Sequence, residues 1–140
     1  MCSPGETLPP FPKPTHSKDP GSAGLIPRLS INQAISNIPE GWPDHDVEGA
    51  KVRNGPPVSG DRLAPTMTTS GSGIDHPSGE RAMTNRENAC LQGFPLEHKF
   101  GKYGVLQQIG NAVPPIVGEI LLKEIKKALQ KADRVDEDRA

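Results

Sequence analysis

The sequence predicts a chain with a loop-rich front half and a helical back half, containing two to four helices and little strand. Proline and glycine supply 16 and 15 of the 140 residues, and 13 of the prolines fall at or before Pro77. Residues 116–140 contain no proline, so continuous helix is allowed there. Only 33% of residues are hydrophobic and 4% aromatic, which is little material for a core. We therefore expect part of a larger fold or a partly ordered chain.

Charge and cysteine content exclude several classes of protein. The formal net charge is −1, so no global field attracts nucleic acid or an acidic membrane. Cys2 and Cys90 lie far apart without a CxxC pattern, and His76 beside Asp75 lacks further ligands, so we expect no disulfide framework and no metal site. No stretch is apolar enough for a membrane span, and the first residues do not resemble a signal peptide. An intracellular chain with reduced thiols is the expectation.

The front of the chain, residues 1–28, is predicted to be an extended Pro-rich segment. Its prolines between Leu8 and His16 favour a polyproline II path. A short helix follows, because the apolar residues at 31, 34, 35 and 38 have helical spacing, Ser30 suits the N-cap and Pro39 ends the run. Residues 40–60 show no periodicity. Residues 65–69 are β-prone and lead into Ser-Gly-Ser-Gly, which predicts a short strand and then a flexible loop.

The clearest helix signal lies at Thr84. Thr84 and Glu87 have the spacing of a capping box, so we expect Glu87 to be a capping carboxylate and not a catalytic acid or base. The helix is predicted to run to about Gln92, where Gly93 suits a left-handed end and Pro95 forbids continuation.

Two more helices are predicted beyond this one. A short helix follows Tyr103 and is expected to break at Gly110 and Asn111. Pro114 and Pro115 then open an amphipathic helix whose apolar stripe begins at Ile116 and whose other face carries lysines. The charged tail, residues 132–140, is expected to fray. Because the front half offers few large apolar residues, the stripe requires a packing partner from outside this chain.

Two motifs in the back half carry a family resemblance. Residues 81–95 read Arg-Ala-Met-Thr-Asn-Arg-Glu-Asn-Ala-Cys-Leu-Gln-Gly-Phe-Pro, and residues 108–115 read Gln-Ile-Gly-Asn-Ala-Val-Pro-Pro. In this order and at this separation they resemble the last two conserved blocks of the DNA (cytosine-5) methyltransferases. Residues 8–17, 29–39, 64–69 and 76–81 resemble other parts of the family more weakly.

The resemblance implies an α/β fold with a Rossmann-like lobe that binds S-adenosyl-L-methionine and a smaller lobe that reads DNA. In that family a cysteine thiolate adds to carbon 6 of a flipped cytosine and a glutamate supports ring nitrogen 3. The Pro-Cys-Gln and Glu-Asn-Val segments that carry these groups do not occur in this sequence, and neither Cys2 nor Cys90 has the right surroundings to replace the nucleophile. The chain thus resembles a C-terminal fragment, with no catalytic residue and no activity expected alone.

On this reading the chain divides into four parts. Residues 1–28 form the Pro-rich segment, 29–80 belong to the target-recognition region, 81–131 hold the two motifs and a closing helix that packs on the missing catalytic lobe, and 132–140 are the tail. DNA would be bound by the complete enzyme, a complementary catalytic-lobe chain is a candidate partner, and the resemblance to eukaryotic members implies the nucleus if the source is eukaryotic.

Four residues are candidates for binding. The resemblance places Asn111 and Val113 in the wall of the S-adenosyl-L-methionine pocket; the alternative is that Asn111 only caps the following helix. Arg81 and Arg86 are candidates for DNA phosphate contacts, although a structural role in holding the base of the recognition lobe is favoured.

Two other functions stay open at this point. The chain could be a non-catalytic interaction protein that uses residues 8–14 as a polyproline ligand, but this leaves both motifs unexplained. It could also be a DNA-binding remnant, which the absence of a basic surface disfavours.

Overall fold

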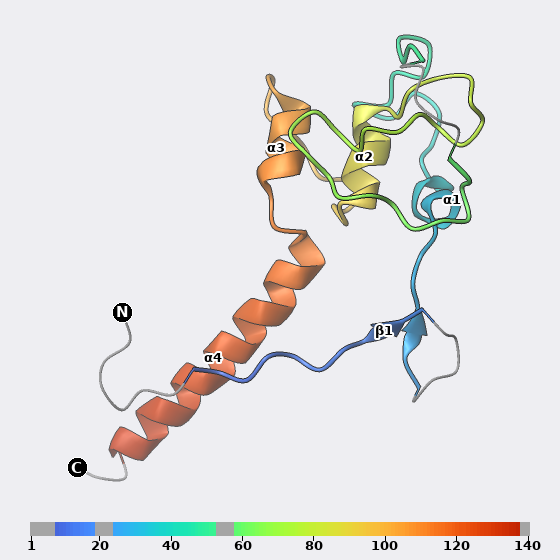
Figure 1. The fold of residues 1–140 in the computed structure, drawn as a ribbon. Coiled ribbons are helices and arrows are strands. Elements are labelled where there is room, and N and C mark those ends of the chain that lie inside the picture. The colour runs from blue at the N-terminus through green and yellow to red at the C-terminus, as the bar shows by residue number, and fades with distance from the viewer. Residues whose placement is uncertain (1–7, 19–23, 53–57, 138–140) are drawn as a thin grey trace.

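Short helices joined by long loops make up the first part of the fold, and one long helix follows them (Figure 1). The structure is a computed structural model that describes residues 8–18, 24–52 and 58–137. Its elements are β1 (His16–Ser17), β2 (Ile26–Pro27), α1 (Ile31–Ile35), α2 (Asn85–Leu91), α3 (Val105–Asn111) and α4 (Pro115–Glu137). Four helices and little strand in the described residues agree with the prediction.

The helices α1, α2 and α3 form a body around two small apolar clusters. Ile31, Ile35 and Met83 make the first cluster, between α1 and the segment before α2. The second cluster joins α2 to α3 and comprises Met67, Ala89 and Ile109. Leu91 packs against both clusters, so α2 is the central element of the body.

Local signals in the sequence explain where α1 begins and ends. The Ser30 hydroxyl accepts a hydrogen bond from the Gln33 amide, and the Gln33 side chain accepts one from the Ser30 amide, which is a full capping box. The helix ends at Ile35 and not at residue 38. The Ser36 hydroxyl donates to the Gln33 carbonyl, the group that a continuing helix would have bonded at residue 37.

The strand predicted at residues 65–69 was wrong. In its place the chain makes an isolated antiparallel bridge between Thr68 and Gly71. Gly71 has φ +95°, and the Thr68 hydroxyl donates to its carbonyl at 2.8 Å, so this segment closes into a tight turn and has no partner strand. The two-residue parallel pairing of β1 with β2 was not expected.

The helix α4 leads away from the body as one continuous helix of 23 residues. The predicted break at Gly110 and Asn111 was two residues early, because both residues belong to α3 and the backbone becomes extended only at Ala112. The helix α4 extends to Glu137, residues 138–140 lie outside the described part, and the fraying expected of the tail from residue 132 stays a prediction.

The Pro-rich front segment crosses α4 (Figure 1). Residues 8–12 line a small cavity together with Leu121, Glu124 and Ile125 of that helix. Residues 8–15 have neither helix nor strand, as predicted, whereas residues 1–7 and 19–23 of the predicted segment lie outside the described part.

Candidate functional site

The first motif builds a buried polar network at the start of α2. The Thr84 hydroxyl accepts a hydrogen bond from the Glu87 amide, and Glu87 accepts one from the Thr84 amide at 2.8 Å, so the predicted capping box is confirmed. Arg81 donates to both oxygens of the same carboxylate, at 2.8 and 2.7 Å. Glu87 is therefore fully used as a cap and ion-pair partner, as expected from the sequence.

This network shifts the titration of its members. Burial alone would raise the pKa of Glu87, but the hydrogen bonds from Arg81 and Thr84 and the Arg81 charge outweigh it and hold the pKa below its usual value. The pKa of His76, whose ring lies 3.7 Å from Glu87, is lowered by burial first and then by Arg81. The fold thus favours a charged Glu87 beside a neutral His76.

Arg86 is the largest fully buried side chain of the described residues, with 1% of its surface exposed. Its guanidinium donates to the carbonyls of Pro43, Leu96 and His98 and to the carboxylate of Asp44 at 3.1 Å. These groups belong to two loops on either side of α2. Arg86 joins the loops to the helix, which is the structural role favoured above.

Arg81 also acts inside the fold. Besides the Glu87 carboxylate, its guanidinium donates to the Ala82 carbonyl at 3.0 Å, and its side chain is 16% exposed. The contacts of Arg81 and Arg86 support an organising role within the fold. Contact of either arginine with DNA stays a prediction.

Gln92 connects the two motifs. Its side-chain amide donates to the Ala112 carbonyl at 2.9 Å and to the Ile109 carbonyl at 3.4 Å. These carbonyls lie on either side of Asn111, so the end of the first motif fixes the backbone of the second.

The two candidate cofactor residues lie on this fixed turn. Asn111 is the last residue of α3 and is exposed, and Val113 is 62% exposed. Within the described part of the chain the Asn111 side chain makes no hydrogen bond, so the capping role considered for it is not observed there. The turn therefore presents one amide without a hydrogen-bond partner among the described residues and one apolar side chain that is mostly exposed.

A close backbone contact also holds this turn. A Cβ atom added at Gly110 would lie 2.3 Å from the carbonyl carbon of Thr68, so only glycine lets α3 approach the 68–69 backbone so closely. The sequence predicted that Gly110 allows a close contact with another backbone segment, but it did not identify residues 68–69 as that segment.

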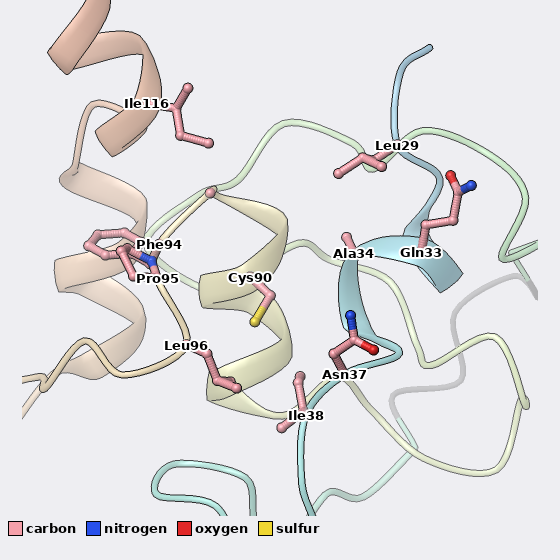
Figure 2. A pocket seen from close by; sticks show the side chains of 11 residues that line it. Leu29, Gln33, Ala34, Asn37, Ile38, Cys90, Phe94, Pro95, Leu96 and Ile116 are labelled. Carbon is pink, nitrogen blue, oxygen red and sulfur yellow. The ribbon is translucent and has the colours of Figure 1, made fainter. Parts of the chain in front are cut away.

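An open apolar cavity of about 390 Å³ lies between α1, α2 and the start of α4. Figure 2 shows the Cys90 side chain on α2 between Leu96 and the Ala34 and Ile38 side chains. Burial raises the pKa of the Cys90 thiol, with the Arg86 charge opposing it. A thiol that resists ionisation in an apolar wall is a poor nucleophile. The absence of a catalytic residue from this chain stays a prediction.

Sequence reasoning missed the loop that contains Trp42 and Asp44. The Trp42 indole donates to the Leu96 carbonyl at 3.0 Å, the Asp44 carbonyl accepts from the Arg86 amide at 2.8 Å, and His45 bonds the Thr84 hydroxyl at 2.9 Å. Asp44 has φ +64°, a conformation that asparagine and aspartate tolerate better than most residues. The lone tryptophan of the chain was the one available signal, because residues 40–60 have no periodicity.

Metal ligands and membrane spans were searched for in the described ranges. Within them, no three His, Cys, Asp or Glu side chains are grouped as a metal ion would require. None of the helices described is both long and apolar enough to cross a membrane.

Comparison with known proteins gives matches to one family. Residues 18–127 match the model of the C-5 cytosine-specific DNA methylases. The type II methylase M.HgiDII of Herpetosiphon aurantiacus is 41% identical over 132 residues, which cover 78% of this chain and 37% of the relative. The type II methyltransferase M.AquIB of Picosynechococcus sp. is 39% identical over 88 residues, covering 53% of this chain and 62% of the relative.

The same likeness extends to a eukaryotic protein. The DNA (cytosine-5)-methyltransferase PliMCI of Paracentrotus lividus is 41% identical over 69 residues, 46% of this chain and 4% of the relative. No solved structure gives a significant match. The chain spans less than two thirds of the length of each of these relatives, and only about a third of M.HgiDII.

Proposed function

Because the chain belongs to the C-5 cytosine-specific DNA methylase family, we propose that it is the C-terminal part of a DNA (cytosine-5) methyltransferase. It supplies one wall of the S-adenosyl-L-methionine pocket and the base of the recognition lobe to a second chain that carries the catalytic half. The complete enzyme transfers a methyl group from this cofactor to carbon 5 of cytosine in DNA, and this chain alone is inactive.

The observation that carries the proposal is the Gln92 link between the two motifs. Two hydrogen bonds fix the carbonyls around Asn111, and Gly110 holds the same turn against Thr68. The turn is thus positioned before any ligand arrives, while the side chains of Asn111 and Val113 are exposed. Such pre-positioned, unused groups suit one side of a pocket whose other side belongs to another element.

The division of labour follows from what this chain lacks. Pro-Cys-Gln and Glu-Asn-Val do not occur in its sequence, and the thiol of Cys90 lies in an apolar wall with a raised pKa. The thiolate and the glutamate must therefore come from outside this sequence, and the proposal assigns them to a second chain. In this proposal Asn111 binds a polar group of the cofactor, and Val113 contacts its adenosyl part.

The lengths of the relatives support two separate chains. An 88-residue match covers 62% of M.AquIB, so that methyltransferase is itself a short chain, whereas a longer match covers only 37% of M.HgiDII. The family thus contains chains of about this size. We propose that the present chain is likewise a separate short chain.

The test is reconstitution. This chain is mixed with a chain that carries the Pro-Cys-Gln half, and transfer of labelled methyl groups to a cytosine-containing duplex is followed. We expect transfer by the mixture and none by either chain alone. Absence of transfer, although both chains are folded, would contradict the proposal.

The cofactor wall is tested in the same mixture. Asn111→Ala is expected to raise the KM for S-adenosyl-L-methionine about tenfold, since a ligand hydrogen bond contributes roughly 1 kcal/mol or somewhat more. The matched control is Gln107→Ala, which removes an exposed amide from the same helix. An equal rise in KM for both variants would contradict the placement of Asn111 in the cofactor pocket.

A further inference from the structure

The cavity between α1, α2 and the start of α4 is an open apolar hollow on the body (Figure 2). It measures about 390 Å³, and among the described residues that line it none is charged. Two of these residues, Leu29 and Ile116, are 63% and 59% exposed. Large apolar side chains gathered around an open hollow mark an interaction site, because only another surface can bury them.

The cavity is continuous with the apolar stripe of α4. Ile116 is the first residue of that stripe and also lines the cavity, and a Cβ added at Gly93 would lie 3.8 Å from its Cδ1 atom. A surface that packs along the stripe therefore reaches the cavity at Ile116. The front segment does not occupy this place, because residues 8–12 line a separate cavity beside Leu121 and Ile125.

Two amide side chains at the cavity indicate what kind of group can enter it. Gln33 on α1 and Asn37 just after that helix line the cavity together with its apolar residues. The Gln33 oxygen accepts from the Ser30 amide, but its amino group and the whole Asn37 side chain bond no other described residue. Free amides beside an apolar hollow can bind the peptide groups of a segment that inserts an apolar side chain.

The length of a relative indicates where such a segment comes from. The match covers 37% of M.HgiDII, so more than half of that methylase has no counterpart in this chain. The cavity is formed by residues 29–38, residues 90–96 and Ile116, all within the family match over residues 18–127. It is therefore a feature of the shared part of the fold, open toward whatever the rest of the fold supplies.

We propose that the second chain, which carries the catalytic half, inserts an apolar side chain into this cavity when it packs along α4. The inference rests on the proposed function and adds a docking point on the body to the closing helix. Cys90 lies in the wall of the cavity, so the access of a reagent to its thiol reports whether the cavity is covered.

Alkylation of Cys90 tests the docking. Cys2→Ser leaves Cys90 as the one thiol of the chain, and its reaction with N-ethylmaleimide is followed by mass spectrometry. We expect a saturating concentration of the second chain to slow the reaction roughly tenfold or more. The matched control carries Glu48→Cys in place of both native thiols. Glu48 is exposed and does not line the cavity, so that thiol should react equally fast with and without the second chain.

Filling the cavity gives a second test. Ala34→Phe puts a ring into the cavity from α1, so we expect it to weaken binding of the second chain about tenfold. Gln107→Phe adds the same ring to an exposed position of α3 outside the cavity and should leave binding unchanged. Circular dichroism verifies that both variants are folded.

Methyl transfer by the same mixture separates this inference from the proposed function. Transfer with an unprotected Cys90 would overturn the inference alone, and absence of both transfer and association would overturn both. Protection of Cys90 without transfer would support the docking and contradict the proposed function. Protection that rises with the concentration of this chain alone would place another copy in the cavity and overturn the inference. The same follows if Ala34→Phe binds the second chain as tightly as the wild type.

Discussion

The body and α4 use their side chains in opposite ways. In the body Ile31 and Ile109 are fully buried, and even Arg86 and Asn88 are enclosed, whereas on α4 large apolar side chains such as Ile116 lie mostly in solvent. The body is therefore held together by contacts within the chain, many of them polar. The helix α4 contributes an apolar surface whose burial needs another surface.

This contrast explains how so thin a composition supports an ordered body. Part of the limited apolar content is placed on α4 and adds nothing to the two clusters of the body. Hydrogen bonds from buried side chains to loop carbonyls take over the task of holding the long connections in place. Substitutions that remove contacts should therefore destabilise the fold more in the body than on α4.

The largest effect is expected from Arg86→Ala. The substitution leaves the carbonyls of Pro43 and His98 and the Asp44 carboxylate without this donor, while the Leu96 carbonyl keeps only the Trp42 indole, so we expect it to lower the free energy of unfolding by about 3–5 kcal/mol. Urea denaturation followed by Trp42 fluorescence measures the loss. The control is Arg62→Ala, an exposed arginine of the same body, which should change the free energy by less than about 0.5 kcal/mol. Equal losses would contradict the role assigned to Arg86.

Gly→Ala substitutions on either side of the α3–α4 turn are expected to have opposite signs. Gly110→Ala puts a methyl group 2.3 Å from the Thr68 carbonyl carbon, so we expect a loss of about 1–3 kcal/mol. At Gly118 the added Cβ meets Val113 at an ordinary 3.9 Å, and the higher helix propensity of alanine should stabilise α4 by up to about 1 kcal/mol. Thermal unfolding followed by circular dichroism compares the two substitutions. If both substitutions lower the stability of the chain, the prediction of opposite signs is wrong.

Sequence reasoning succeeded where a residue acts on its own neighbours along the chain. The capping boxes at Ser30 and Thr84 use side chains and amides only three residues apart, and the spacing alone identifies them. The start of α4 after Pro114 follows from the same kind of local rule. The family itself was evident from two contiguous motifs and is confirmed by the match over residues 18–127.

The long-range contacts could not be predicted in this way. Arg86 binds Asp44 across 42 residues, and Gln92 reaches Ala112 across 20, with no periodic pattern to link the partners. Residues 65–69 have strand propensity, but propensity does not reveal that Thr68 closes a turn onto Gly71. Polar contacts between irregular segments depend on the folded arrangement, which composition and spacing do not encode.

The Glu87 carboxylate gives the stability of the body a pH dependence. Glu87→Gln keeps an N-terminal cap but loses the charge that binds Arg81, so we expect a loss of about 1–2 kcal/mol at neutral pH. The folded pKa of Glu87 is below its unfolded value, so the unfolded state binds more protons between the two. The stabilisation is thus complete above the ordinary carboxylate pKa and is lost as the pH falls through the lowered one.

Urea denaturation of the wild type and of Glu87→Gln across a pH series measures how the stabilisation by Glu87 depends on pH. The difference between wild type and Glu87→Gln should shrink as the pH becomes more acidic. Both forms also contain His76, whose folded pKa is below its ordinary value of 6.5. Both forms should therefore lose stability as the pH falls below 6.5. This loss should occur at a higher pH than the loss caused by protonation of Glu87. A difference that stays constant down to strongly acidic pH would show that the charge of Glu87 is not what stabilises the cap.

The smallest effect concerns the junction between the body and α4. Gln92→Ala removes two hydrogen bonds to the carbonyls on either side of Asn111, and we expect it to cost only about 1 kcal/mol of global stability. Amide hydrogen exchange in residues 109–113 should accelerate far more than exchange in α1, because the turn loosens while the body remains folded. Gln108→Ala is the control, since that side chain holds the carbonyls of Gly101 and Tyr103 on another loop. If both variants change exchange at residues 109–113 equally, the second motif is positioned by α3 packing and not by the first motif.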